Sequence, residues 1–257
     1  AKIFPPTSSE KDAEVFRLAL ELNEKVDPDI LQEALDITME SFPFYSVVLR
    51  RGAFWYYFEK TNKRPLVEKE LNTVCAPLFS KDEKDLLFRV FYYNNRINLE
   101  IHHSLSDGTG AIWFLKTLVY HYLIKKHKED FIDNKPEKPF FGSYSEKVDD
   151  SFQKYYTGEK QLAYPKSVKA HRITGTRMDD NRTILIEGTM SVKAVLDEAH
   201  KYKTSLTGFL AALVMYSVYK EMSVRQEKWP VVLSIPVNLR QFFISETARN
   251  FFGTIRI

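Results

Sequence analysis

The chain has little of several residue types, and each shortage excludes a class of protein. A single cysteine, Cys75, excludes an internal disulfide framework and fits a reducing compartment. Only nine glycines and eleven prolines stand among 257 residues that are 44% hydrophobic, which indicates an ordinary globular chain with a sizeable core. No apolar run reaches the roughly 18 to 20 residues that a membrane helix needs, and the N-terminus has no signal-type core. We therefore expect a cytoplasmic protein.

An excess of charge of one sign is also lacking. The 37 basic and 34 acidic residues give a formal net charge of +3, and both signs are spread along the chain. This charge is too small and too mixed to indicate a nucleic acid or a membrane surface as partner. The length suits one large domain or two modest ones.

The turn at residues 101–108 holds two histidines, a carboxylate and a glycine. Upstream, the period-two pattern of residues 97–103 places His103 on the apolar face of a strand and His102 on the opposite face. Downstream, apolar residues recur at helical spacing, so Asp107 and Gly108 mark the change from strand to helix. An imidazole therefore ends a buried strand beside the start of a helix.

His103 is the candidate catalytic group in this turn. An imidazole, with an ordinary pKa near 6.5, can be neutral at working pH and accept a proton from a hydroxyl or amine that attacks a carbonyl. Asp107 is placed to brace the turn or to cap the helix. Gly108 leaves space or supplies an unusual backbone angle, which would keep a channel open beside the imidazole.

The same residues allow plainer interpretations. Two histidines can simply end a strand while Asp107 caps a helix, although this set of four fixed positions arises by accident in fewer than about one chain in a hundred. A metal site built from His102, His103 and Asp107 is disfavoured because neighbouring strand residues point to opposite faces. Cys75 lies in a polar connection without a recognisable partner, so we predict that it is a bystander rather than a catalytic thiol.

The rest of the chain is predicted to alternate strands and helices. Strands are expected at residues 15–22, 45–49, 54–58, 86–93, 97–103, 183–190 and 230–237. Helices are expected from Pro28 through Met39, stopped by Pro43, from Gly108 to about Lys128, after Ser191, and after Thr204 or Ser205. We expect the last helix to be mostly buried and residues 230–237 to be a central strand covered on both faces. Residues 61–84 and 131–180 are expected to be irregular connections.

The motif His102-His103-Ser104-Leu105-Ser106-Asp107-Gly108 resembles that of the chloramphenicol acetyltransferase-like superfamily. This superfamily includes the condensation domains of nonribosomal peptide synthesis, plant acyltransferases and alcohol acetyltransferases. Supporting stretches are residues 20–49, Ile235 to Arg240, and Asn250 to Gly253, which stand in the same order and at similar spacing. The first motif is specific to the superfamily. The other stretches are less specific and support the resemblance because they occur together with the motif.

The resemblance implies an α/β fold of the α+β type, a two-layer sandwich, with His103 as the base that deprotonates the acceptor while it attacks a thioester. It implies that Asp107 pairs with Arg240, and that His102 and Gly108 support the site. From the residues alone, a buried guanidinium needs a carboxylate, although a surface position for Arg240 stays open. The implied co-substrate is acyl-CoA, without a metal, and the implied partners are a small alcohol or amine acceptor or a carrier protein.

We predict that residues 1–130 form an N-terminal subdomain with the motif, 131–180 a linker, and 181–257 the start of a similar C-terminal subdomain. Members of the superfamily usually have two similar halves with the reaction channel between them, and here the second half stops soon after Gly253. We therefore expect a fragment, or a fold completed by another chain, that is inactive alone. The leading hypothesis is an alcohol-acetyltransferase-type acyltransferase; the alternatives are a carrier-protein-dependent condensation domain and a non-catalytic binding or scaffold protein.

Overall fold

The computed structural model describes residues 13–71, 73–78, 85–132, 136–137, 139, 143–158, 169–176 and 184–257. The chain divides into two compact units. One consists of Ala1–Tyr155, Asp179–Thr183 and Asn238–Phe252, and the other of Tyr156–Met178, Ile184–Val237 and Gly253–Ile257. A late segment of the chain, Asn238–Phe252, thus belongs to the same unit as the histidine turn. The division of the sequence at residues 131–180 stays a prediction.

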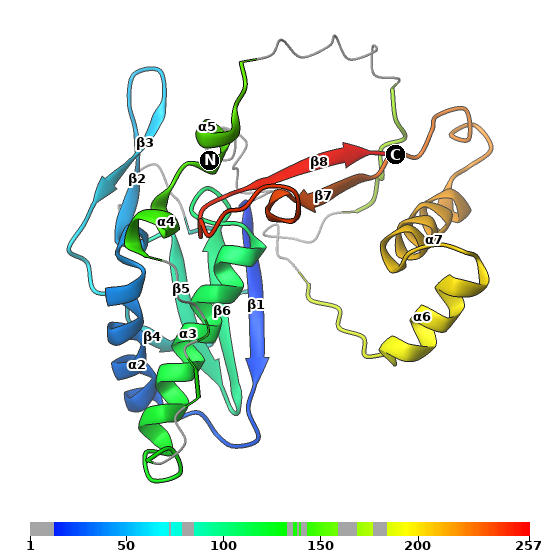
Figure 1. The fold of residues 1–257 in the computed structure, drawn as a ribbon. Coiled ribbons are helices and arrows are strands. Elements are labelled where there is room, and N and C mark those ends of the chain that lie inside the picture. The colour runs from blue at the N-terminus through cyan, green and yellow to red at the C-terminus, as the bar shows by residue number, and fades with distance from the viewer. Residues whose placement is uncertain are drawn as a thin grey trace. The chain divides into compact units, whose positions relative to one another are not determined.

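The first unit is built on a four-stranded sheet with the order β1-β6-β5-β4 (Figure 1). Strands β1 (Val15–Glu21), β6 (Arg96–His102) and β5 (Phe88–Tyr93) are antiparallel neighbours, and β4 (Val67–Lys69) pairs with β5 in parallel. The β5-β6 hairpin turns at Asn94, whose φ of 51° suits an asparagine. The predicted irregular connection at residues 61–84 therefore contains an edge strand, which is too short to show an alternating pattern.

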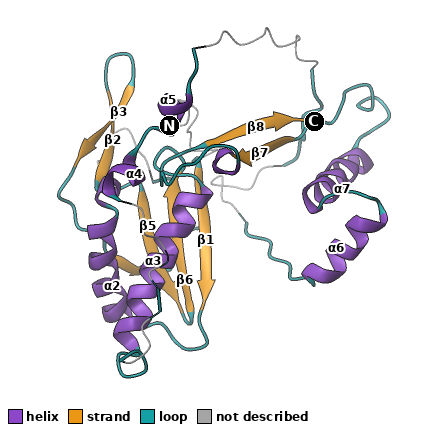
Figure 2. Ribbon diagram, in the orientation of Figure 1, coloured by secondary structure: helices purple, strands orange, loops and turns teal. Residues whose placement is uncertain are grey.

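Two helices cover one face of this sheet (Figures 1 and 2). Helix α2 (Pro28–Ser41) packs beside α3 (Gly108–Lys126). The Asp27 side chain caps α2 by accepting hydrogen bonds from two backbone N–H groups of its first turn, and Pro28 fits there because it has no N–H to satisfy. Both helices lie where the sequence predicts them, and the arrangement is the predicted two-layer α+β sandwich.

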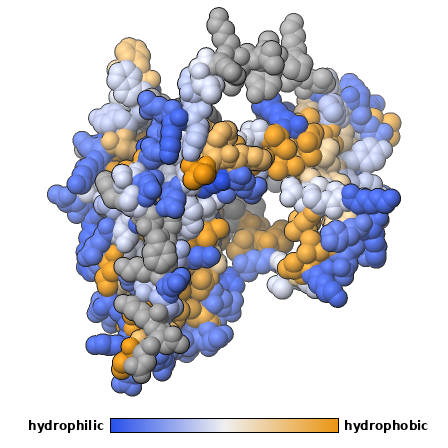
Figure 3. Space-filling model, in the orientation of Figure 1, coloured by the Kyte–Doolittle hydropathy of each residue, from blue (hydrophilic) through white to orange (hydrophobic). Residues whose placement is uncertain are grey.

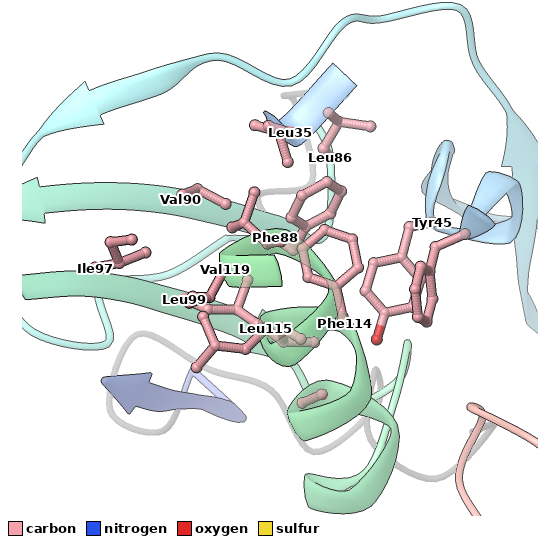
Figure 4. Packing of buried hydrophobic residues seen from close by; sticks show 14 of the residues in the cluster. Leu35, Tyr45, Leu86, Phe88, Val90, Ile97, Leu99, Phe114, Leu115 and Val119 are labelled. Carbon is pink, nitrogen blue, oxygen red and sulfur yellow. The ribbon is translucent and has the colours of Figure 1, made fainter. Parts of the chain in front are cut away.

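The core lies between the sheet and the helices, and Figure 4 shows its packing. The rings of Tyr45 and Phe114 stack with centroids 4.8 Å apart and an interplanar angle of 11°. Tyr45 ends the short 3₁₀ helix η1 (Pro43–Tyr45) and is fully buried. Aliphatic side chains from α2, β5, β6, α3 and the segment just before β5 belong to the same cluster: Leu35, Leu86, Val90, Ile97, Leu99, Leu115 and Val119. This core fixes the start of α3 against the end of β6.

A second, two-stranded sheet joins β2 (Val47–Arg51) to β3 (Tyr56–Lys60). The predicted hairpin is confirmed, with both strands starting two residues later than expected. Two short helices, α4 (Tyr144–Val148) and α5 (Ser151–Tyr155), lie within the predicted linker. Helix α4 begins with a capping box, a reciprocal pair of bonds that a Ser and the Glu three residues on can form.

The late segment Asn238–Phe252 packs on α4. It begins at the end of β7 (Ser234–Asn238) and continues into the 3₁₀ helix η3 (Leu239–Gln241). The N–H of Ala248 donates to the carbonyl of Lys147 at 3.0 Å. The Thr247 hydroxyl donates to the Asp149 carbonyl at 2.8 Å. These bonds anchor the late segment within the first unit.

The second unit contains two helices and most of a small sheet. Helices α6 (Val192–Lys201) and α7 (Leu206–Glu221) are capped by Ser191 and Ser205, as predicted. The sheet pairs β7 with β8 (Phe252–Arg256). None of the described helices is both long and apolar enough to cross a membrane.

Three predictions for this unit are wrong. Residues 184–190 form no strand, while Thr183 lies outside the described residues. Helix α7 was expected to be buried, but Leu210, Leu213 and Val214 are 43 to 50% exposed. The strand predicted as central at residues 230–237 spans 234–238, is partly exposed, and among the described residues pairs with β8 alone. Figure 3 shows hydrophobic side chains at the surface of the unit. Hydrophobicity indicates which residues suit burial, but it does not supply the element that covers them.

Candidate active site

The two histidines lie where strand β6 passes into the turn. The strand ends at His102, and His103 begins the turn with its N–H bonded to the Glu14 carbonyl at 2.7 Å. Both faces of the strand are buried. The apolar face consists of Ile97, Leu99 and Ile101, and the other of Asn98, Glu100 and His102; all six are 0% exposed. The predicted alternation is confirmed, but the face that carries His102 is as fully buried as the apolar one.

Glu100 explains how a polar face can be buried. Its carboxylate is paired with Arg17 at 2.7 Å and with Arg89 at 2.8 Å, and it also accepts the backbone N–H of Cys75 at 2.7 Å. A buried charge is tolerated when it is paired and hydrogen-bonded in this way. Burial, with the charge of Glu100, raises the pKa of the Cys75 thiol. A raised pKa disfavours the thiolate, which supports the prediction that Cys75 is not a nucleophile.

His102 holds the turn together. Its Nδ1 accepts the N–H of Ser104 at 3.2 Å and lies 2.8 Å from the Ser104 hydroxyl. Because a backbone N–H can only donate, Nδ1 carries no proton in this arrangement. Burial, followed by the charge of the adjacent His103, lowers the pKa of His102 to about 4. His102 is therefore neutral at neutral pH.

His103 lies between two aromatic rings. Its imidazole is 5.1 Å from the ring of Phe16 and 5.4 Å from that of Phe252, measured between centroids. Phe16 stands opposite Ile101 in the β1-β6 register, so the imidazole is on the apolar side of the sheet, as predicted. The side chain is only partly buried. The imidazole is thus flanked by two rings, and its Nδ1 is buried.

Asn250 fixes the backbone of His103 from the other side. Its side-chain N–H₂ donates to the His103 carbonyl at 2.8 Å and to the Ser104 carbonyl at 3.3 Å. The His103 peptide is thereby held at both its N–H and its C=O. Sequence reasoning assigned no role to Asn250, because a single asparagine in a loop belongs to no periodic pattern.

Asp107 is a structural brace. Its Oδ1 accepts the N–H of Gly110 at 3.0 Å, which caps α3. Its Oδ2 accepts the N–H of Phe251 at 2.8 Å and a guanidinium N–H of Arg240 at 2.8 Å. Both carboxylate oxygens therefore accept hydrogen bonds, from Gly110, Arg240 and Phe251. The residue is only 4% exposed.

Arg240 is the predicted partner of Asp107, and the pair is present; the alternative of a surface arginine is wrong. The side chains are 7% and 6% exposed. Arg240 also donates to the carbonyls of Thr247 at 2.7 Å and Arg249 at 2.8 Å, and its guanidinium lies over the Trp113 ring. The guanidinium thus shapes the loop that carries Asn250 to the histidine turn.

The two glycines at the start of α3 have different roles. Gly108 is exposed, its φ is not positive, and an added Cβ would meet nothing within 4 Å. The unusual backbone angle proposed for Gly108 is therefore wrong, while the open space is present. A Cβ on Gly110 would lie 2.0 Å from the Ala248 oxygen and 2.4 Å from the Ser106 hydroxyl. The sequence signal for this close approach was a second glycine inside a helix.

Among the described residues, His103 belongs neither to a metal site nor to one of three pockets of the first unit. Within the described residues, no group of three or more His, Cys, Asp or Glu could hold a metal ion. Three pockets of about 500, 310 and 320 Å³ in the first unit are lined by other residues, and His103 is in none of these three. The candidate role of His103 as a base therefore depends on the residues that contact it, not on a pocket or a metal site.

Comparisons with known proteins come from solved structures. No protein-family model matches the chain, and no curated protein matches it. The polyketide synthase associated protein 5 from Mycobacterium tuberculosis matches 95% of the chain at 16% identity with a TM-score of 0.56. The first condensation domain of the calcium-dependent antibiotic synthetase matches 95% at 13% identity, with a TM-score of 0.53. The chain has the condensation-domain fold.

A structure solved with coenzyme A has the same fold. TRI101 from F. sporotrichioides, crystallised with coenzyme A and T-2, matches 98% of the chain at 12% identity with a TM-score of 0.53. At such identities the likeness shows the fold alone, and it confirms the predicted fold class. The chain spans 62% and 63% of the lengths of the M. tuberculosis protein and the condensation domain.

Proposed function

We propose that the chain carries the general base of an acyl-transfer enzyme, and that this base is His103. The observation that carries the proposal is the setting of the imidazole. The backbone N–H and C=O of His103 are both hydrogen-bonded, and its half-buried side chain lies beside the rings of Phe16 and Phe252. General-base catalysis needs an imidazole held within reach of the acceptor proton.

The proposed reaction joins an acceptor to an acyl thioester. The imidazole takes the proton of an alcohol or amine while the acceptor's oxygen or nitrogen bonds to the thioester carbonyl carbon. When the resulting tetrahedral intermediate breaks its carbon–sulfur bond, the thiolate leaves and the imidazolium returns the proton to it. Asp107 takes no part in proton transfer, because its two oxygens are bonded to Gly110, Phe251 and Arg240.

For the donor we propose a CoA thioester, with an acetyl group as the first candidate. The support is the TRI101 structure, which has this fold and was crystallised with coenzyme A. The condensation-domain structure favours a second candidate, a donor carried by a carrier protein. A non-catalytic protein with this fold is the third, and it predicts no turnover with either donor.

The test is thiol release by the full-length protein, its His103→Ala variant and a His200→Gln control in an exposed part of α6. Acetyl-CoA and an acetylated carrier protein serve as donors, with a panel of alcohols and amines as acceptors. His103→Ala should lower kcat by about 10² to 10⁴-fold while thermal unfolding is unchanged. Equal rates for wild type and His103→Ala would overturn the base assignment, and the donor that supports turnover distinguishes the two enzyme candidates.

A further inference from the structure

A groove in the first unit lies apart from the imidazole of His103. It has a volume of about 310 Å³, and five separate parts of the chain line it: η1, the β2-β3 hairpin, the histidine turn, the end of α4 and residue 249 of the late segment. Its apolar walls are Pro43, Phe44, Val47, Phe58, Leu105 and Val148. Val47 stands opposite Lys60 in the β2-β3 register, so these two side chains and Phe58 share one face of the hairpin.

Among the described residues that line this groove, the charged ones are two cations, Lys60 and Arg249. Lys60 is exposed, and no hydrogen bond or ion pair joins it to another described residue. The Arg249 side chain donates one hydrogen bond, from Nη1 to the Val148 carbonyl at 3.3 Å, and no described carboxylate pairs with it. An apolar groove flanked by two cations without counter-charges is complementary to an amphiphilic anion.

Three other basic residues near this hairpin are paired. Arg50 pairs with Glu59, Lys63 with Asp85, and Arg64 with Asp36. These three cations have carboxylate partners within the chain, whereas Lys60 and Arg249, like the exposed Arg51 at the end of β2, have none among the described residues. Since Lys60 and Arg249 both line an apolar groove, they could pair with a ligand that brings its own negative charge.

We propose that this groove binds a small carboxylate with an unbranched apolar tail of about eight carbons, which fits a pocket at the lower end of the usual size range. The tail lies against Phe44, Phe58 and Leu105, and the carboxylate is held by Lys60 and Arg249. The site is independent of the acyl-transfer reaction proposed for His103. Leu105 and Arg249 are each within two residues of groups that hold the histidine turn, so an occupied groove borders that turn without entering it.

The experiment is isothermal titration of the protein with butyrate, hexanoate, octanoate and octanol. If the groove takes the tail, affinity should rise by up to about fourfold for each added methylene from butyrate to octanoate. Octanoate should bind at least tenfold more tightly than octanol, because the alcohol cannot pair with Lys60 and Arg249. Absence of octanoate binding, a flat chain-length series, or equal affinity for octanol would overturn the proposal.

Variants locate the site. Lys60→Gln and Arg249→Gln should each weaken octanoate binding several-fold, and Lys63→Gln, an exposed lysine outside the groove, should leave it unchanged. Val148→Phe should fill the groove and block binding, with thermal unfolding as the check that the variant is folded. If Val148→Phe does not fold, Lys60→Gln still tests the site, because the side chain of Lys60 is exposed and makes no hydrogen bond or ion pair with a described residue. Equal octanoate affinity for wild type and Lys60→Gln would contradict the assignment.

Discussion

Arg240 and Asp107 are 133 residues apart in the chain, and their side chains meet at 2.8 Å in the interior. The pair joins the start of α3 to the late segment that carries Asn250. The desolvation of both charges is offset by a complete set of hydrogen bonds to the guanidinium and the carboxylate. The pair of Arg64 and Asp36, with a separation of 2.6 Å, is a comparable ion pair at the surface, made by two hydrogen bonds and without this burial.

Replacing Arg240 by alanine should lower the free energy of unfolding by about 3 to 5 kcal/mol, because it leaves the buried Asp107 carboxylate without a counter-charge. Chemical denaturation of the two proteins measures this difference. Arg64→Ala removes the same kind of pair from the surface and should leave the stability nearly unchanged. A similar loss of stability in both variants would contradict the importance assigned to burial.

The two glycines at the start of α3 should respond in opposite directions to alanine. Gly110→Ala should destabilise the fold by about 1 to 3 kcal/mol or more, because its Cβ would overlap the Ala248 carbonyl, a backbone atom that cannot rotate away. Gly108→Ala should raise the stability by up to about 1 kcal/mol, since its Cβ meets open space in a helical position. Denaturant titrations of both variants check this, and an unchanged Gly110→Ala protein would refute the tight contact.

His102 should make stability depend on pH. Its pKa is about 4 in the folded protein and near 6.5 in an unfolded chain, so the unfolded state binds the extra proton between these values. Stability should therefore be full above pH 6.5 and fall by up to about 3 kcal/mol as the pH is lowered towards 4.

The matched variant for this effect is His102→Gln, whose amide cannot titrate. Its free energy of unfolding should vary less between pH 6.5 and 4 than that of the wild type, even if its stability at pH 7 is lower. His200→Gln, on an exposed helix, should keep the wild-type slope. Parallel curves for wild type and His102→Gln would show that His102 does not carry the pH dependence.

Cys75 should react slowly with iodoacetamide in the folded protein. Its raised pKa leaves less thiolate at pH 7 than in the unfolded chain, and the thiolate is the reactive form. The measurement is the alkylation rate in buffer and in denaturant, followed by mass spectrometry. A folded-state rate equal to that of the denatured chain would contradict the protected thiol, and Cys75→Ser should leave acyl transfer unaffected.

Short-range chemistry made much of the first unit predictable from the sequence. Asp27 and Pro28 start α2, and Asn94 turns the β5-β6 hairpin, because caps and turns depend on residues close in the chain. The pairing of Asp107 with Arg240 was predictable for a different reason: a buried ionic group requires a partner, and the resemblance named one. The proposed role of His103 still awaits the kinetic test.

The parts that could not be predicted depend on contacts between distant segments. Gly110 is needed because Ala248 packs against it, and Asn250 acts on a carbonyl 147 residues earlier. Neither contact produces a periodic pattern in the sequence from which it could be predicted. The face of β6 that carries Glu100 has polar residues, yet it is buried in the structure. The charge of Glu100 is neutralised there by Arg17 from β1 and Arg89 from β5.

The bond from the Phe251 N–H to Asp107 spans 144 residues, which sets an order of events during synthesis. A ribosome that adds about 5 to 20 residues per second needs roughly 7 to 30 s to travel that distance. Throughout this interval the nascent chain holds an Asp107 that lacks its later partners and a His103 whose carbonyl is not yet clamped. The histidine turn can reach its final form only after translation has passed residue 251.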